Sequence, residues 1–192
     1  MLPVNPLFFS HDSSNTISSN NLNAKIKLLE AASALNVSEK LNIIALLLGY
    51  KWVTDVAIDK KSNWTVVRRI LDDLKLPHQQ NHYFYKEEKH EWIQVAASER
   101  LLEYILSHRD DLSVIEAGVL YGYPVSHSLG YMELIQKQWK NNKTIAEFYF
   151  SGVFSKAYHS RESEHFETVW QHVSSCSDVI TRQAKDFYQQ SK

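Results

Sequence analysis

The chain has 192 residues, 44% of them hydrophobic and 22% charged, and its 21 Lys and Arg residues against 22 Asp and Glu residues give a net charge of −1. This composition is ordinary for a folded globular protein and excludes a largely disordered chain, collagen and a coiled-coil rod. The near-neutral charge also excludes a global field that would draw the protein to nucleic acid or to an anionic membrane.

The first 23 residues differ from the rest of the chain. Residues 10–23 hold five Ser and four Asn, so they bury too little surface to offset the entropy of ordering. We therefore predict a flexible N-terminal lead over residues 1–23 and a single helical domain over residues 24–192. No secretory signal and no apolar run of bilayer-spanning length is visible, which predicts a cytoplasmic protein that does not enter a membrane.

Apolar residues recur at helical spacing in the next part of the sequence. They predict four helices, over residues 24–35, 38–49, 52–58 and 62–76. Ser38 has the side chain of a helix N-cap, Gly49 suits a helix C-terminus, and Pro77 stops the fourth helix.

The periodicity changes after Pro77. Two runs rich in aromatic and β-branched residues, His82 to Lys86 and Trp92 to Val95, flank a charged stretch and predict a β-hairpin near residues 82–96. The alternative for this segment is a disordered loop. Helical spacing returns afterwards and predicts helices over residues 98–106, 113–121, 126–139, 161–175 and 177–189. The expected fold is mostly α, with one small hairpin.

The first half of the chain has the order of elements of a winged helix. Arg68 and Arg69 lie on the helix before the hairpin and are the candidate contacts to a nucleic acid. Asp72 and Asp73 on the same helix oppose this interpretation, as do the acidic residues of the hairpin turn. The same order of elements also suits a protein-docking or peptide-recognising scaffold.

Tyr121-Gly122-Tyr123-Pro124 is the most distinctive segment of the sequence. Gly122 permits a left-handed turn at a helix end, and Pro124 fixes the next part of the backbone, so a tight helix–turn–helix corner is expected. The candidate ligand-binding residues of this corner are Tyr121, Tyr123, Ser126, His127 and Tyr131. The candidate catalytic residues are His127, as acid or base, with Tyr121 and Tyr123. The alternative is a packed corner whose rings belong to the core. Ala45-Leu-Leu-Leu-Gly-Tyr50 echoes the same pattern, which C-cap chemistry alone would explain.

Histidines near the C-terminus suggest a second kind of site. His165 and His172 are seven residues apart and fall on one helix face. With Cys176, or with His127, they would form a site for a divalent metal. The favoured alternative is that these histidines are solvated or hydrogen-bonded in the core. A Cys176 thiolate activated by His172 is a further, weaker alternative.

The segments Leu48–Lys51, Leu74–Leu76 and Glu116–Pro124 together resemble a family of small, largely uncharacterised archaeal and bacterial proteins. The motif of that family is approximately Gly-x-Leu-Leu-Gly-Tyr-Pro-x-Cys-Cys, with an aromatic residue four positions later and a second Cys motif after a His. Ser126 and His127 replace the cysteine pair here, Tyr131 supplies the aromatic residue, and His172–Cys176 matches the second motif. The resemblance implies no established activity, and three of the four family cysteines are missing.

Three functions follow as hypotheses. The first is a binding or adaptor domain that recognises another protein or a small molecule at Tyr121–His127. The second is a small enzyme that uses His127 with Tyr121 or Tyr123, assisted by a metal on His165 and His172. The third is a winged-helix regulator that binds nucleic acid, which the charge balance disfavours. The sequence leaves open whether the protein is an enzyme.

Overall fold

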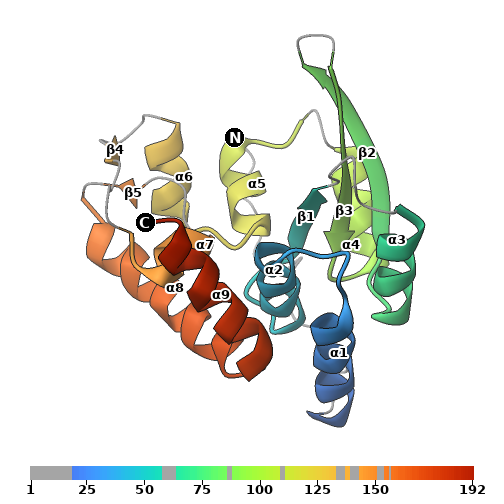
Figure 1. Ribbon diagram of the computed structural model, residues 1–192. Coiled ribbons are helices and arrows are strands. Elements are labelled where there is room, and N and C mark those ends of the chain that lie inside the picture. The colour runs from blue at the N-terminus through green and yellow to red at the C-terminus, as the bar shows by residue number, and fades with distance from the viewer. Residues whose placement is uncertain are drawn as a thin grey trace.

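Helices make up most of the described part of the computed structural model, which also contains a small antiparallel sheet (Figure 1). The prediction of a mostly α fold with a small β-hairpin is therefore confirmed. The structure describes residues 19–57, 64–85, 88–108, 111–132, 137–138, 143–150, 154–155 and 157–192. Within them, no helix is both long enough and apolar enough to cross a bilayer.

The first helix, α1 (Ser19–Ala31), begins before the predicted end of the flexible lead. Residues 19–23 are thus helical, and the rest of the lead, residues 1–18, lies outside the described residues. The early start has a physical reason, because Leu22 packs against the hydrophobic core. Tertiary contact therefore extends a helix that local composition would not support.

The second helix, α2 (Val37–Leu47), lies at the centre of the fold. Its N-cap is Asn36, not Ser38, and a reciprocal capping box joins Asn36 to Glu39. The helix buries residues around most of its circumference, as expected of a helix enclosed by other elements. It contacts α1, β1 and three C-terminal helices, so its apolar run organises the core.

The sheet has three strands in the order β1-β3-β2. The predicted hairpin is β2 (His78–Tyr85) and β3 (Glu88–Ala96), which pair antiparallel. The predicted short helix over 52–58 is wrong, because this segment forms β1 (Val53–Ala57) and pairs with β3. Val53 and Val56 are buried there. The β-branched side chains of β1 therefore gain more from sheet packing than from an isolated turn of helix.

The helix α3 (Trp64–Asp73) lies beside the sheet and directs Val67 and Leu71 into the core. It ends at Asp73, and in the turn that follows Lys75 has a φ of 53°, an angle that residues with a side chain rarely adopt. The next helix, α4 (Glu99–Ser107), is capped by Ser98 as predicted. Three of its residues, Leu101, Leu102 and Ile105, form a second apolar cluster with Val53, Ala96 and Leu120.

The C-terminal half is built from helices and two very short strands. Its elements are α5 (Val114–Leu120), α6 (Val125–Tyr131), β4 (Lys137–Gln138), α7 (Ile145–Phe150), β5 (Phe154–Ser155), α8 (His159–Ser174) and α9 (Asp178–Gln190). The two predicted C-terminal helices are confirmed as α8 and α9. In Figure 1 these two helices lie on the opposite side of the fold from α3 and the hairpin.

Candidate functional site

Two Gly-Tyr turns of identical construction end α2 and α5. Gly49 and Gly122 both have a φ of 81°. In each turn the Tyr amide donates to a carbonyl five residues earlier, from Tyr50 to Ala45 and from Tyr123 to Gly118, both at 2.9 Å. This pattern is the left-handed helix ending that the sequence predicts at both sites. The echo in the sequence is therefore explained by C-cap chemistry.

The two turns pack directly against each other. A Cβ atom placed on Gly122 would lie 2.3 Å from the Tyr50 carbonyl oxygen and 2.9 Å from Cγ of Lys51, so only glycine fits. The helix α8 holds both turns, because Nε2 of His165 donates to the Gly122 carbonyl at 3.1 Å and Nδ1 of His172 is hydrogen-bonded to the Tyr50 hydroxyl. The expected bend after residue 121 thus brings the middle of the chain against its tail.

His127 lies inside the packed corner and is only 5% exposed. Its ring stacks on Tyr123 with centroids 4.6 Å apart and meets the edge of Phe166 at 5.9 Å. Burial, with a smaller contribution from the Lys143 charge, lowers the pKa of His127 to about 4. The imidazole is therefore neutral near pH 7 and unsuited to act as a general acid. These contacts are those of a packed corner, the alternative interpretation of this segment.

The remaining predicted residues of the corner are dispersed. The Tyr121 hydroxyl faces the sheet and donates to Oδ2 of Asp55 at 2.8 Å, away from the stacked rings. Ser126 is half-buried in α6, and the side chain of Tyr131 lies outside the described part of the structure. The structure therefore brings Tyr123 and His127 together and directs Tyr121 elsewhere.

A chain of polar side chains extends from Tyr121 across the sheet. Gln94 on β3 donates to the Tyr121 hydroxyl at 3.3 Å, and Asn81 on β2 donates to Gln94 at 3.4 Å. Burial and the nearby Asp55 carboxylate raise the pKa of Tyr121. The phenol is therefore a neutral hydrogen-bond donor that joins α5 to β1, with no tendency to ionise near pH 7.

The predicted metal ligands have other partners. His165 and His172 bind the two turns, and Sγ of Cys176 donates to the His172 carbonyl at 3.3 Å. Burial raises the pKa of the Cys176 thiol, which favours the uncharged form over a thiolate. Within the described residues, no three His, Cys, Asp or Glu side chains are grouped so that they would hold a metal ion.

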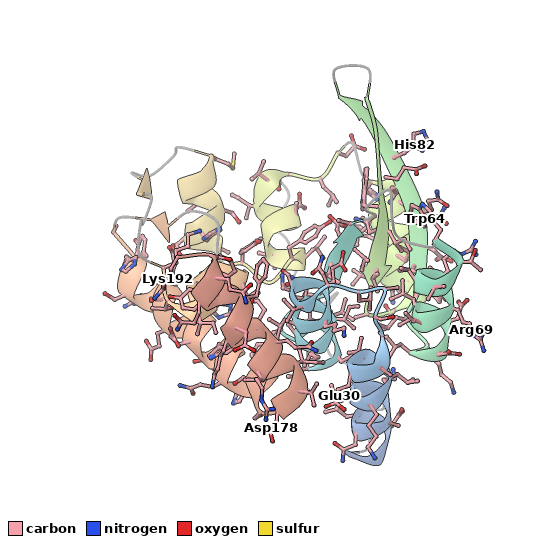
Figure 2. All side chains as sticks on the ribbon, in the orientation of Figure 1. Glu30, Trp64, Arg69, His82, Asp178 and Lys192 are labelled. Carbon is pink, nitrogen blue, oxygen red and sulfur yellow. The ribbon has the colours of Figure 1, made fainter. Side chains whose placement is uncertain are left out.

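The predicted nucleic-acid contacts lie on an exposed surface. Arg68 and Arg69 are both exposed on α3, with Thr65 one turn earlier. No hydrogen bond or ion pair joins either guanidinium to another described residue. The carboxylate of Asp72 would oppose nucleic-acid binding. Its Oδ1 lies 3.8 Å from Nε2 of His78, at the start of β2. In Figure 2, Arg69 points outward from the flank of the fold where His82 of β2 also lies.

Two further lysines, to which no sequence motif points, gather near the end of α3. Burial, and after it the charge of Lys75, lower the pKa of Lys25 on α1. Because the Lys75 charge contributes to this lowering, the two ammonium groups lie close enough to repel each other. An anion bound between them would relieve this repulsion. No periodic signal could have revealed the pair, because the two residues are 50 positions apart (25 and 75).

Comparison of the chain with family models, with curated proteins and with solved structures gives no match. The resemblance in the Gly-Tyr-Pro segment therefore stays an expectation, and functional inference depends on the geometry described above.

Proposed function

We propose that this protein binds double-stranded DNA through the exposed face of α3. The observation that carries the proposal is the pair Arg68 and Arg69. Both side chains are exposed. Arg69 lies on the side of α3 opposite Val67 and Leu71, which anchor the helix, and Arg68 lies on the flank next to it. Arginine forms paired hydrogen bonds to phosphate and to guanine, so an exposed arginine pair without an intramolecular partner among the described residues is suited to a DNA contact.

The dimensions of α3 support this assignment. A helix of ten residues is about 15 Å long, and the major groove of B-DNA, about 12 Å wide, admits an α-helix. The major groove of an RNA duplex is too deep and narrow for side chains to read, so DNA is the better fit. The adjacent β2–β3 hairpin projects beyond the body of the fold (Figure 1), but the sequence where its strands join holds Glu87 and Glu88, so we assign the contact with DNA to α3 alone.

Local charge supports the proposal better than the overall charge does. Arg68, Arg69, Lys25 and Lys75 contribute four cationic groups at this end of the molecule, against two carboxylates, those of Asp73 and of Asp72, which lies 3.8 Å from Nε2 of His78. A net charge of −1 for the whole chain does not prevent binding, because salt screens charges more than about 10 Å apart. The hypothesis of a ligand site at Tyr121–His127 has less support, since His127 is enclosed by aromatic rings.

Fluorescence anisotropy with a labelled duplex of about 20 base pairs, titrated between about 50 and 200 mM salt, tests the proposal. We expect the wild-type protein to bind and R68A/R69A to bind more weakly. The slope of log K against log salt should decrease by about 2, at roughly 0.9 for each phosphate that the variant no longer neutralises.

The matched control is R161A/R182A, which removes the same charge from α8 and α9, on the opposite side of the fold. It should leave both the affinity and the salt slope nearly unchanged. Equal weakening by the two double variants, or no binding of the wild-type protein at the lowest salt, would overturn the proposal. Circular dichroism of each variant checks that the fold is retained.

A further inference from the structure

A buried lysine lies beneath the junction of the two Gly-Tyr turns. Lys51, the residue after the first turn, is 7% exposed. Its aliphatic stem lies under Gly122, where even one added carbon would come within 2.9 Å of Cγ. Its Nζ atom lies 5.5 Å from the centroid of the Tyr123 ring. The α5–α6 corner therefore covers most of this side chain.

The amine of Lys51 has no hydrogen-bond or ion-pair partner among the described residues. Lys40 provides a contrast within the same molecule. Its side chain is as little exposed, at 5%, but its Nζ donates to the Glu30 carbonyl at 3.5 Å and is attracted by the Glu30 charge. The electrostatic partners of Lys51 are the Tyr123 ring and the charge of the Asp55 carboxylate.

The environment favours the neutral, nucleophilic form of Lys51. Burial lowers the pKa of Lys51 to about 8, against an opposing attraction from Asp55. About a tenth of the Lys51 amine is then neutral at pH 7. This is roughly 300 times the neutral fraction of a lysine with the ordinary pKa of 10.5. A desolvated lysine of this kind is the type of amine that proteins use in Schiff-base chemistry.

We propose that Lys51 is a nucleophilic lysine that forms an imine with a small, neutral aldehyde. The Nζ lone pair attacks the carbonyl carbon, a proton moves from nitrogen to oxygen, and the resulting carbinolamine loses one water to give the C=N bond. No oxidant or reductant is consumed, and hydrolysis reverses the step. The low exposure of Lys51 limits the size of the aldehyde that can reach it, and the Asp55 carboxylate disfavours an anionic one.

Reductive trapping on the wild-type protein tests this proposal. The folded protein is treated at about pH 7 with limiting propanal and cyanoborohydride, which reduces the imine to a stable alkyl-lysine, and peptide mass spectrometry then measures the initial labelling rate at each lysine. We expect Lys51 to be labelled at least about tenfold faster than the exposed Lys27 and Lys185, a margin that allows for the lower nucleophilicity of a less basic amine.

Lys40 is the internal control, because its side chain is as little exposed as that of Lys51, but its amine is less deeply buried and has a carbonyl partner. It should be labelled more slowly than Lys51. Asp55→Asn should accelerate labelling of Lys51 further, because it removes the charge that stabilises the ammonium form. Labelling of Lys51 no faster than that of Lys27 and Lys185, or equal labelling of Lys40 and Lys51, would overturn the proposal. The readout is independent of DNA binding.

Discussion

Replacing Gly122 by Ala should destabilise the fold strongly, because two separate constraints meet at this position. The backbone has a φ of 81°, and an added Cβ would lie 2.3 Å from the Tyr50 carbonyl oxygen. That oxygen belongs to the main chain, so relief requires the two Gly-Tyr turns to move apart. Their separation would also strain the hydrogen bond from His165 to the Gly122 carbonyl, which is 3.1 Å long.

The magnitude follows from these parts. A left-handed conformation costs an L-residue about 1–2 kcal/mol. Loss of the His165 hydrogen bond adds about 1 kcal/mol, and local repacking around Tyr50 adds about 1–3 kcal/mol. The free energy of unfolding should therefore fall by about 4 kcal/mol, which lowers Tm by roughly 10 °C at about 2–4 °C per kcal/mol for a chain of this size.

Urea unfolding followed by circular dichroism measures this change. Gly122→Asn is the informative control, because Asn tolerates positive φ better than Ala does but still carries a Cβ. If the contact between the added Cβ and the Tyr50 carbonyl oxygen causes most of the loss of stability, both variants should be destabilised to a similar extent. Gly49→Ala should also lose the free energy that a left-handed backbone costs an L-residue, since Gly49 has a φ of 81° as well. A decrease of less than about 1 kcal/mol in Gly122→Ala would refute the packing described here.

Three further predictions concern single residues. Lys75→Gly should raise the free energy of unfolding by about 1 kcal/mol, because Lys75 has a φ of 53° at the end of α3; an unchanged urea midpoint would contradict this. Burial, with a smaller contribution from Lys143, lowers the pKa of His127 to about 4 in the fold. The unfolded value is about 6.5, so protonation favours the unfolded chain, and the stability present above pH 6.5 is lost as pH falls towards 4, by up to about 3 kcal/mol. His127→Phe should flatten this part of the stability profile, and an unchanged slope would show that other groups cause it. Because burial raises the pKa of the Cys176 thiol, its reaction with an aromatic disulfide near pH 8 should be at least about tenfold slower in the folded protein than in concentrated guanidinium chloride; equal rates would contradict the burial.

Local signals in the sequence are sufficient where a helix is defined by its own residues. Ser98 and Ser113 cap α4 and α5 as predicted, and the two Gly-Tyr turns end α2 and α5 at the expected glycines. In each case the atoms that satisfy the backbone are within five residues of one another. Capping and helix termination therefore leave a pattern that a single sequence displays.

Contacts between residues that are far apart in the sequence leave no such pattern. The sequence predicts a helix in place of β1 because the strand partner, β3, comes more than 30 residues later and pairs Val53 with Ala96. No motif marks Lys51 as a candidate, because its burial depends on Gly122, which covers it from another part of the chain. Sequence alone likewise places His127, Tyr121 and Tyr123 together, but the Tyr121 hydroxyl faces Asp55 instead.

The most direct test of DNA binding through α3 is an amide NMR spectrum of the isotopically labelled protein titrated with duplex DNA. The account predicts that the largest chemical-shift changes fall on residues 64–82, covering α3 and the first part of β2, with Arg68 and Arg69 among them. Changes centred on the Tyr121–His127 corner or on α8 and α9, or no changes at a tenfold excess of duplex at about 50 mM salt, would contradict it.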